Sequence, residues 1–236
     1  MKIHTINGYE KVGGNMTAVE IGGELVVLDV GADIERVKGE GKSLGDMKRG
    51  EAVEKKMVPD DSEIREREED VVAIIVGHGH LDHCLGIPKL AGAYGCPIIA
   101  TLFTISVIQR LVGGDREDIP NDLISLEPGE STNISDDIEL EFIPVAHSVP
   151  QTVLPVLRTS EGTVVYSLDF KFGGNPPPEE SLGEDELREL GGEGVEALIP
   201  DCTRADEPGN AGSEVSVKEK LKEILDRSYE DDEGVG

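Results

Sequence analysis

The segment that most constrains the fold is an apolar run that ends in a dense group of polar side chains. Residues 71–76 read VVAIIV, and the chain continues as GHGHLDH. A short run of apolar, mostly β-branched residues is typical of a buried strand with both faces covered. Four potential metal ligands follow at its carboxyl end: His78, His80, Asp82 and His83. The pattern therefore predicts a site on the loop after a buried strand.

The spacing of these side chains predicts two neighbouring metal positions. Residues i and i+2 of an extended segment point to the same side, so His78 and His80 can hold one ion. Asp82 and His83 lie beyond the turn into a helix and suit a second ion, although Asp82 is also a candidate helix cap. Imidazole and carboxylate ligands favour zinc, or manganese where oxygens dominate. Three of the chain's 5 histidines fall here, which argues against an incidental polar loop.

Length and cysteine content indicate one large domain in a reducing compartment. The 236 residues can bury a sizeable core and fit one large domain or two small ones, and we take residues 1–236 as one domain. No run of about 18 apolar residues predicts a membrane span, and the N-terminus lacks the apolar core of a signal peptide. The 3 cysteines are odd in number and widely spaced. We therefore expect free thiols and a cytoplasmic location.

The charge is strongly acidic. The sequence has 49 acidic and 22 basic residues, which gives a formal net charge of −27. Excess surface carboxylate suits a cytoplasm of high salt, where self-repulsion is screened, and ordinary acidic solubility is the alternative. Aromatic residues make up 3% of the chain, and no basic patch with interleaved aromatics is present. Composition alone therefore does not indicate a nucleic-acid-binding protein.

Short apolar runs between turn residues predict two β-rich parts with helices around them. Strands are expected at 17–21, 25–30, 71–76, 97–100, 123–126, 138–145, 153–157, 163–168 and 195–200. Helices are expected around 45–56 and at 86–94, 103–112, 184–190 and 215–225. The order predicts a layered α/β (α+β) arrangement, with sheets packed together and helices outside.

Other segments have few apolar residues and are expected at the surface. Residues 31–70 predict a surface excursion, in which the charged stretch 63–70 forms a solvated helix or turn. Residues 173–178 predict a rigid, proline-rich loop, and the glycines at 113–114 are expected to stop the preceding helix. The acidic tail, residues 231–236, is expected to be disordered.

Three further polar residues come at the ends of predicted strands. An aspartate at a strand end, such as Asp29, is usually a cap or turn residue. Beside a metal site, Asp29 could instead hold a ligand histidine by bonding to the second nitrogen of the histidine ring. His147 would add a third nitrogen to an ion held by His78 and His80. Asp169 could bridge two cations and offset charge that histidines cannot.

These features together resemble the metallo-β-lactamase superfamily. Its signature is an HxHxDH motif, then a strand-end histidine, then a strand-end aspartate. Several segments are also similar to the ribonuclease J branch in its archaeal form: NMTAVEIGGELVVLDVG, HGHLDHCLGIPKL, VAHSVPQT, SLDFKF and DCTRADEPGNAGSE. The resemblance implies a four-layer αββα fold with two zinc ions that hydrolyses RNA, with 5′-to-3′ exonuclease action as the expected direction. It assigns His78, His80 and His147 to one zinc.

The resemblance also assigns the second zinc and its surroundings. Asp82 and His83 would hold this ion, and Asp169 would bridge the two. Asp82 and Asp169 are thereby expected to act in catalysis. Asp29 would support a ligand from behind, and Ser148 would help to position phosphate.

The sequence departs from the ribonuclease pattern after the DCTRADEPG segment. Such ribonucleases carry an inserted β-CASP domain there and then return with a last histidine for the second zinc. Here the sequence stops soon after Val215, and the one unassigned histidine, His4, lies in the first strand. The fold is therefore expected to be incomplete at its C-terminus. A truncated gene product, a second chain with a β-CASP domain and a weakly held second metal all remain open.

Three functions are compatible with these observations. The first is a zinc-dependent ribonuclease with RNA as its substrate. The second is a small-molecule metallohydrolase of the lactonase or thioesterase kind, which explains the short sequence and the acidic surface. The third is a non-catalytic module completed by a separate β-CASP chain. A homo-oligomer also remains open.

Overall fold

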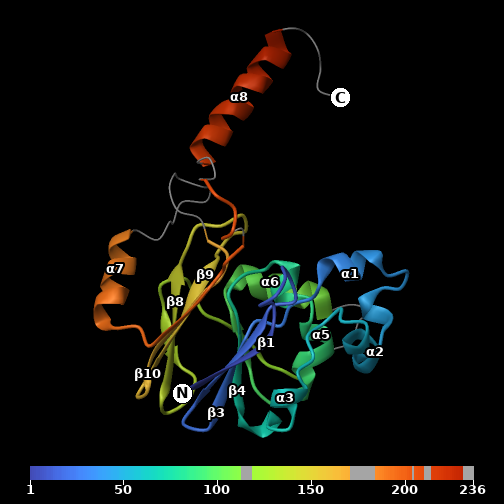
Figure 1. Cartoon of the computed structure of the whole chain (residues 1–236), viewed down its shortest axis with the longest axis vertical. Helices are drawn as coiled ribbons and strands as arrows, with labels where there is room; N and C mark the ends of the chain where they lie inside the picture. Colours follow the sequence, from blue (N-terminus) through green and yellow to red (C-terminus); the bar gives the residue numbers. More distant parts are fainter. Residues whose placement is uncertain (113–118, 171–183, 204, 210–213, 231–236) are drawn as a thin grey trace.

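Two β-sheets pack face to face, with helices on both outer faces (Figure 1). The computed structural model describes residues 1–112, 119–170, 184–203, 205–209 and 214–230. The layered α/β architecture expected from the sequence is confirmed. Among the described residues, no helix combines the length and apolarity needed to cross a membrane.

The first sheet has six strands in the order β1-β2-β3-β4-β5-β6. Its first two pairings are antiparallel and the other three are parallel. Gly22 and Gly23 form the expected turn between β2 and β3, with φ of 59° and 98° that glycine adopts without strain. The strand bounds are β1 (Lys2–Asn7), β2 (Met16–Ile21), β3 (Glu24–Leu28), β4 (Val71–Val76), β5 (Ile98–Ala100) and β6 (Leu123–Ser125).

The second sheet has five strands in the order β11-β10-β9-β8-β7. All its pairings are antiparallel except that of β10 with β11. The sequence did not predict β7, because its three residues, STN, contain no apolar side chain. Pairing with β8 forms it instead, with Ser131 opposite Glu141. The bounds are β7 (Ser131–Asn133), β8 (Ile138–Pro144), β9 (Val153–Thr159), β10 (Gly162–Ser167) and β11 (Ala197–Pro200).

Both faces of the first sheet are buried, and alternation along its strands explains how. In β3, Val26 and Leu28 belong to the core between the sheets, whereas Leu25 and Val27 belong to the core beneath the helices. Successive side chains of a strand point to opposite faces, so one apolar run supplies two cores. Because β3, β4, β5 and β6 are parallel, their carboxyl ends lie together at one edge of this sheet.

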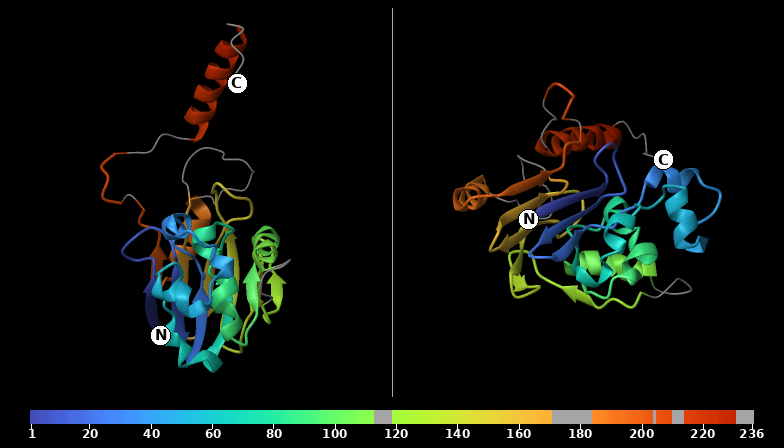
Figure 2. Two further views of the ribbon diagram at one scale, coloured as in Figure 1. Left: turned by 90° about the vertical axis from the view of Figure 1, so that its right-hand side faces the viewer. Right: turned by 60° about the horizontal axis from the view of Figure 1, so that its bottom comes forward.

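Helices cover the outer face of each sheet. On the second sheet, Leu190 of α7 packs against Val156 and Val165. Figures 1 and 2 show α8 standing apart from the two sheets, and five of its apolar side chains are exposed. The bounds are α1 (Ile34–Gly39), α2 (Arg49–Glu54), α3 (Ser62–Arg65), α4 (Leu81–Cys84), α5 (Ile87–Leu90), α6 (Leu102–Val112), α7 (Glu184–Glu193) and α8 (Glu214–Glu230). Short 3-10 turns are η1 (Leu44–Asp46), η2 (Glu68–Asp70) and η3 (Ala91–Ala93).

Two expectations about helices and surface were wrong. The segment 31–70 is more than a surface excursion, because Leu44 and Met47 are buried in the core beneath the helices. The helix expected at 86–94 is instead two short pieces, α5 and η3. The predicted glycine stop at 113–114, the loop at 173–178 and the tail at 231–236 lie outside the described residues.

Truncating Met47 tests its place in the core. The side chain is 1% exposed, so Met47→Ala should lower the free energy of unfolding by about 2–5 kcal/mol. Leu102→Ala is the matched control, because Leu102 is 54% exposed, and its loss should stay below about 1 kcal/mol. Denaturant unfolding of both variants measures the difference, and equal losses would contradict the assignment.

Candidate metal centre

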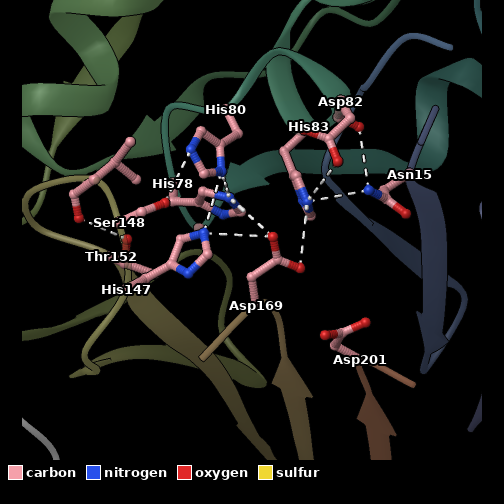
Figure 3. A network of polar contacts seen from close by, with 12 residues as sticks. Asn15, His78, His80, Asp82, His83, His147, Ser148, Thr152, Asp169 and Asp201 are labelled. Atoms are coloured by element: carbon pink, nitrogen blue, oxygen red, sulfur yellow. Dashed lines mark hydrogen bonds and ion pairs between the residues drawn. The ribbon is translucent and has the colours of Figure 1, made fainter. Parts of the chain in front are cut away.

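Segments that follow strands of both sheets bring polar side chains close together (Figure 3). Asp29 follows β3, and the segment His78–His83 follows β4. His147 comes after β8 and Asp169 after β10. In open α/β sheets, small molecules bind at the carboxyl ends of the strands. The side chains named above also lie after the carboxyl ends of their strands.

Four of the predicted ligands form a compact group. The Nε2 atom of His78 lies 3.0 Å from Nδ1 of His80, which is 3.1 Å from Nε2 of His147. Asp169 adds Oδ2, at 3.4 Å from the His147 nitrogen and 3.8 Å from that of His78. The four ligand atoms all lie within 4.8 Å of one another. Ligands about 2 Å from a tetrahedral zinc are roughly 3.3 Å apart, so this group fits one ion.

The protonation of these histidines also suits a cation. Burial lowers the pKa of His78 strongly, and the neighbouring histidines lower it further. Burial and His147 lower the pKa of His80 in the same way. Neutral imidazoles keep a lone pair for a metal ion. The group therefore has the donor chemistry that zinc requires.

A second, wider position lies beside the first. Asp82 places Oδ2 3.5 Å from Nε2 of His83, and Oδ1 of Asp169 is 4.0 Å from the same nitrogen. Asp169 thus directs one oxygen toward each position. The prediction that Asp82 caps a helix was wrong, because His80 is the N-cap of α4 and Asp82 lies in its first turn.

His83 is oriented from behind by a buried carboxylate. Its Nδ1 is 2.6 Å from Oδ2 of Asp29. The same Oδ2 accepts a hydrogen bond from the Tyr166 hydroxyl at 2.9 Å, and Oδ1 of Asp29 accepts one from the Gly77 amide at 3.3 Å. Burial alone would lower the pKa of His83, but the charge and hydrogen bond of Asp29 raise it to about 9. This contact points Nε2 of His83 toward the second position.

Two residues of the site had no signal in the sequence. Asn15 donates from its backbone amide and from Nδ2 to the carbonyl of Asp82, at 3.0 and 3.2 Å, and Nδ2 lies 3.1 Å from Nε2 of His83. Tyr166 lies within a strand, where an aromatic residue usually serves packing. A contact made through folding at such distant positions leaves no local pattern to detect.

A cavity of about 600 Å³ opens beside the second position. Asp82, His83 and Asp169 line it together with Asp201, which follows β11. On the side of the first position, the exposed Ser148 places Oγ 3.4 Å from Nε2 of His80. Both candidate metal positions are thus accessible from outside.

Neutralising Asp29 tests its support of His83. Asn accepts the left-handed backbone found there, φ 59°, but Asp29→Asn removes the charge that orients the ring. Zinc affinity should fall by about 10- to 100-fold at the second position and stay nearly unchanged at the first. Competition with a chelator measures both affinities. Asp61→Asn, at a buried carboxylate bonded to Tyr94, is the control and should leave both unchanged.

Comparisons with known proteins agree with this geometry. A family described as the beta-lactamase superfamily domain matches residues 49–208. Ribonuclease J of Methanocaldococcus jannaschii is 38% identical over 237 residues, which cover 100% of this chain and 53% of the relative. Ribonuclease J of Pyrococcus abyssi is 39% identical over 228 residues, with 95% and 50% covered. The chain spans about half the length of the curated relatives it matches.

Solved structures share the fold at low sequence identity. A protein of unknown function from Enterococcus faecalis V583 superposes with a TM-score of 0.64 at 17% identity, covering 90% of this chain and 52% of that one. A metallo-β-lactamase with a HARLDQ motif from Cronobacter sakazakii gives 0.51 at 15% identity, with 80% and 68% covered. Fold, candidate centre and family match lead to one conclusion: the chain belongs to the metallo-β-lactamase superfamily.

Proposed function

We propose that this protein is a zinc-dependent hydrolase that cleaves phosphodiester bonds in RNA. The observation that carries the proposal is the group of three histidines and one aspartate at the strand ends, His78, His80, His147 and Asp169. RNA is favoured as the substrate because two relatives at 38% and 39% identity are named ribonuclease J. Groups of histidine and aspartate ligands like this one occur in many hydrolases. The choice of RNA among possible substrates therefore rests on the sequence similarity to ribonuclease J.

The proposal assigns the two positions as follows. His78, His80 and His147 hold one zinc, and Asp82 and His83 hold the second. Zinc bound there would supply a Lewis acid that polarises a phosphoryl oxygen and lowers the pKa of a water molecule. Manganese remains an alternative at the second position, where carboxylate oxygens are in the majority.

Asp169 has the properties of a bridging ligand. Burial raises its pKa, but the hydrogen bond with His147 and the charges of His83 and His147 lower it below the ordinary value overall. An ionised carboxylate with one oxygen toward each position offsets the charge of two cations. The Ser148 hydroxyl can donate a hydrogen bond to a phosphoryl oxygen held beside His80. This contact would help to orient the substrate.

The second position has fewer ligands than the first. Among the described residues, three side chains direct an atom toward it: Asp82, His83 and Asp169. Water completes such a site and the ion is held less tightly. We infer that a histidine from a β-CASP domain, in the same protein or in a partner chain, would complete it. Adding a β-CASP-bearing chain should then raise zinc occupancy at this position.

The acidic charge favours a second candidate, hydrolysis of a small neutral substrate such as a lactone or thioester. A net charge of −27 repels RNA at low salt. The two functions separate in one assay of the zinc- or manganese-loaded chain against 5′-monophosphate RNA, a lactone and a thioester, at low and high salt. Cleavage of RNA that rises as salt screens the repulsion and is abolished by a chelator supports the ribonuclease. Turnover of the lactone or thioester alone would overturn it.

A further inference from the structure

The cavity beside the second metal position has an aromatic wall. The loop between β1 and β2 lines the cavity together with the segment after β11. Tyr9 of this loop lines the cavity and is 49% exposed. Asp82 and His83 line the same cavity, so this cavity offers both the second metal position and an aromatic side chain to one bound nucleotide.

The tyrosine is anchored by its hydroxyl and not by its ring. The hydroxyl is 2.6 Å from Oγ1 of Thr17, which is buried. Burial raises the pKa of Tyr9, even though the hydrogen bond with Thr17 lowers it. The hydroxyl is therefore bonded within the protein, whereas Tyr9 as a whole stays about half exposed where it lines the cavity. A half-exposed aromatic ring with a satisfied hydroxyl is available for contact with another flat group.

The loop that carries Tyr9 is fixed to the body of the protein. Asn7 donates from Nδ2 to the carbonyl of Gly14 at 2.6 Å, closing the base of the loop. Lys11 forms an ion pair with Asp33, the N-cap of α1. Gly13 has φ of 95°, which lets the chain turn back toward Asp82. A wall held at several points loses little entropy when a ligand binds.

The charges around the cavity argue against a purely electrostatic grip on RNA. Four carboxylates line it: Glu10, Asp82, Asp169 and Asp201. Among the described lining residues, Lys11 is the one lysine or arginine, and Asp33 already neutralises it. When His83 is a neutral metal ligand, attraction in this cavity must therefore come from bound metal and from uncharged contacts. Stacking of a base on an aromatic ring is such a contact and accepts every base.

We propose that Tyr9 is a stacking platform for one nucleobase of the substrate, next to the phosphate at the metal positions. The inference rests on RNA as the proposed substrate class. It explains how a strongly acidic protein holds a polyanion, because stacking is not weakened by charge repulsion. It also predicts binding that tolerates any base sequence at this position.

The test compares binding of short RNAs with and without each base in turn. Phosphorothioate RNAs of five nucleotides resist cleavage, and one abasic ribose is moved along the strand. With the zinc-loaded chain, one abasic position should weaken binding about tenfold, as expected for loss of one stacked base. Tyr9→Leu should bind the intact RNA about tenfold more weakly, and the same abasic substitution should then cost less than about twofold. Fluorescence anisotropy measures these dissociation constants.

Tyr9→Phe is the matched variant, because it keeps the ring and removes the bond to Thr17. It should retain the sensitivity to the abasic position, and the tenfold ratio should persist at high salt because stacking is not screened. Equal sensitivity of the unaltered protein and Tyr9→Leu at every position would overturn the inference. So would undetectable binding of RNA to the unaltered chain.

The proposed function fails separately from this inference. Hydrolysis of the unmodified RNA by the zinc-loaded chain, alone and with a β-CASP-bearing chain added, tests the first, whereas the Tyr9-dependent abasic effect on binding tests the second. Binding with the expected effect but no metal-dependent hydrolysis, even with the added chain, would overturn the ribonuclease and leave the stacking platform supported. Hydrolysis with no Tyr9-dependent effect on binding would support the ribonuclease and overturn the stacking platform.

Discussion

His78→Ala should remove zinc-induced stabilisation and reduce phosphodiester hydrolysis by roughly a thousandfold, since the Lewis-acid contribution is worth several kcal/mol. His78 contributes Nε2 to the group of four and is fully buried. Its Nδ1 has no hydrogen-bond partner among the described residues, so removing the ring leaves no partner of that atom unsatisfied; the cavity lowers the stability of the metal-free protein but should not unfold it. Free zinc at about 1,000 times its dissociation constant stabilises the unaltered protein by about 4 kcal/mol. Thermal unfolding with and without zinc measures this difference.

His4→Ala is the control for the loss of a buried histidine. His4 is 5% exposed and contacts Glu63 and Glu20 at 2.7 and 3.1 Å, away from the metal positions. This variant should lose some stability but keep the full shift with zinc. If His78→Ala unfolds the metal-free protein, or if it retains the zinc shift, the assignment of the first position is wrong.

Gly31→Ala should produce the largest loss of stability of any single methyl group added near the site. A Cβ at this position would lie 1.6 Å from the carbonyl oxygen of Asp82 and 2.7 Å from the amide nitrogen of Asn15. Both are backbone atoms, so no side-chain rotation relieves the clash. We expect a loss of more than about 3 kcal/mol in the free energy of unfolding.

The same substitution elsewhere should have the opposite sign. Gly50 lies in α2, and a Cβ there would meet no atom within 4 Å. Gly50→Ala should therefore stabilise the protein by up to about 1 kcal/mol, because alanine has the higher helix propensity. Urea unfolding of the two variants gives the comparison. A small effect of Gly31→Ala would mean that the loop after β3 can move away from Asp82.

Prediction from sequence succeeded where the information is local. The run VVAIIV predicted β4 with its bounds, Val71–Val76, because six apolar residues bounded by a charge and a glycine leave little freedom. It failed where pairing or packing decides. The polar strand β7 depends on β8, and the core position of Met47 depends on contacts made only after folding.

The candidate site shows the same division. Strand-end position and ligand type were sufficient to select the side chains that the structure brings together, including His147 and Asp169 from the second sheet. Asn15 and Tyr166 could not be selected in this way. Asn15 contacts His83, which is 68 positions away, and Tyr166 contacts Asp29, which is 137 positions away. Neither is of a residue type typical of zinc sites.

The placement of ligands on both sheets has a consequence for the order of folding. His80 and His147 are 67 positions apart, and His147 and Asp169 belong to the second sheet. Contacts between such distant segments form late, because the intervening chain must first be ordered. On a ribosome, the first sheet would be complete well before its candidate ligands meet those of the second sheet. Zinc bound as proposed would therefore not start the folding of this chain, and its uptake would mark the moment at which the two sheets dock.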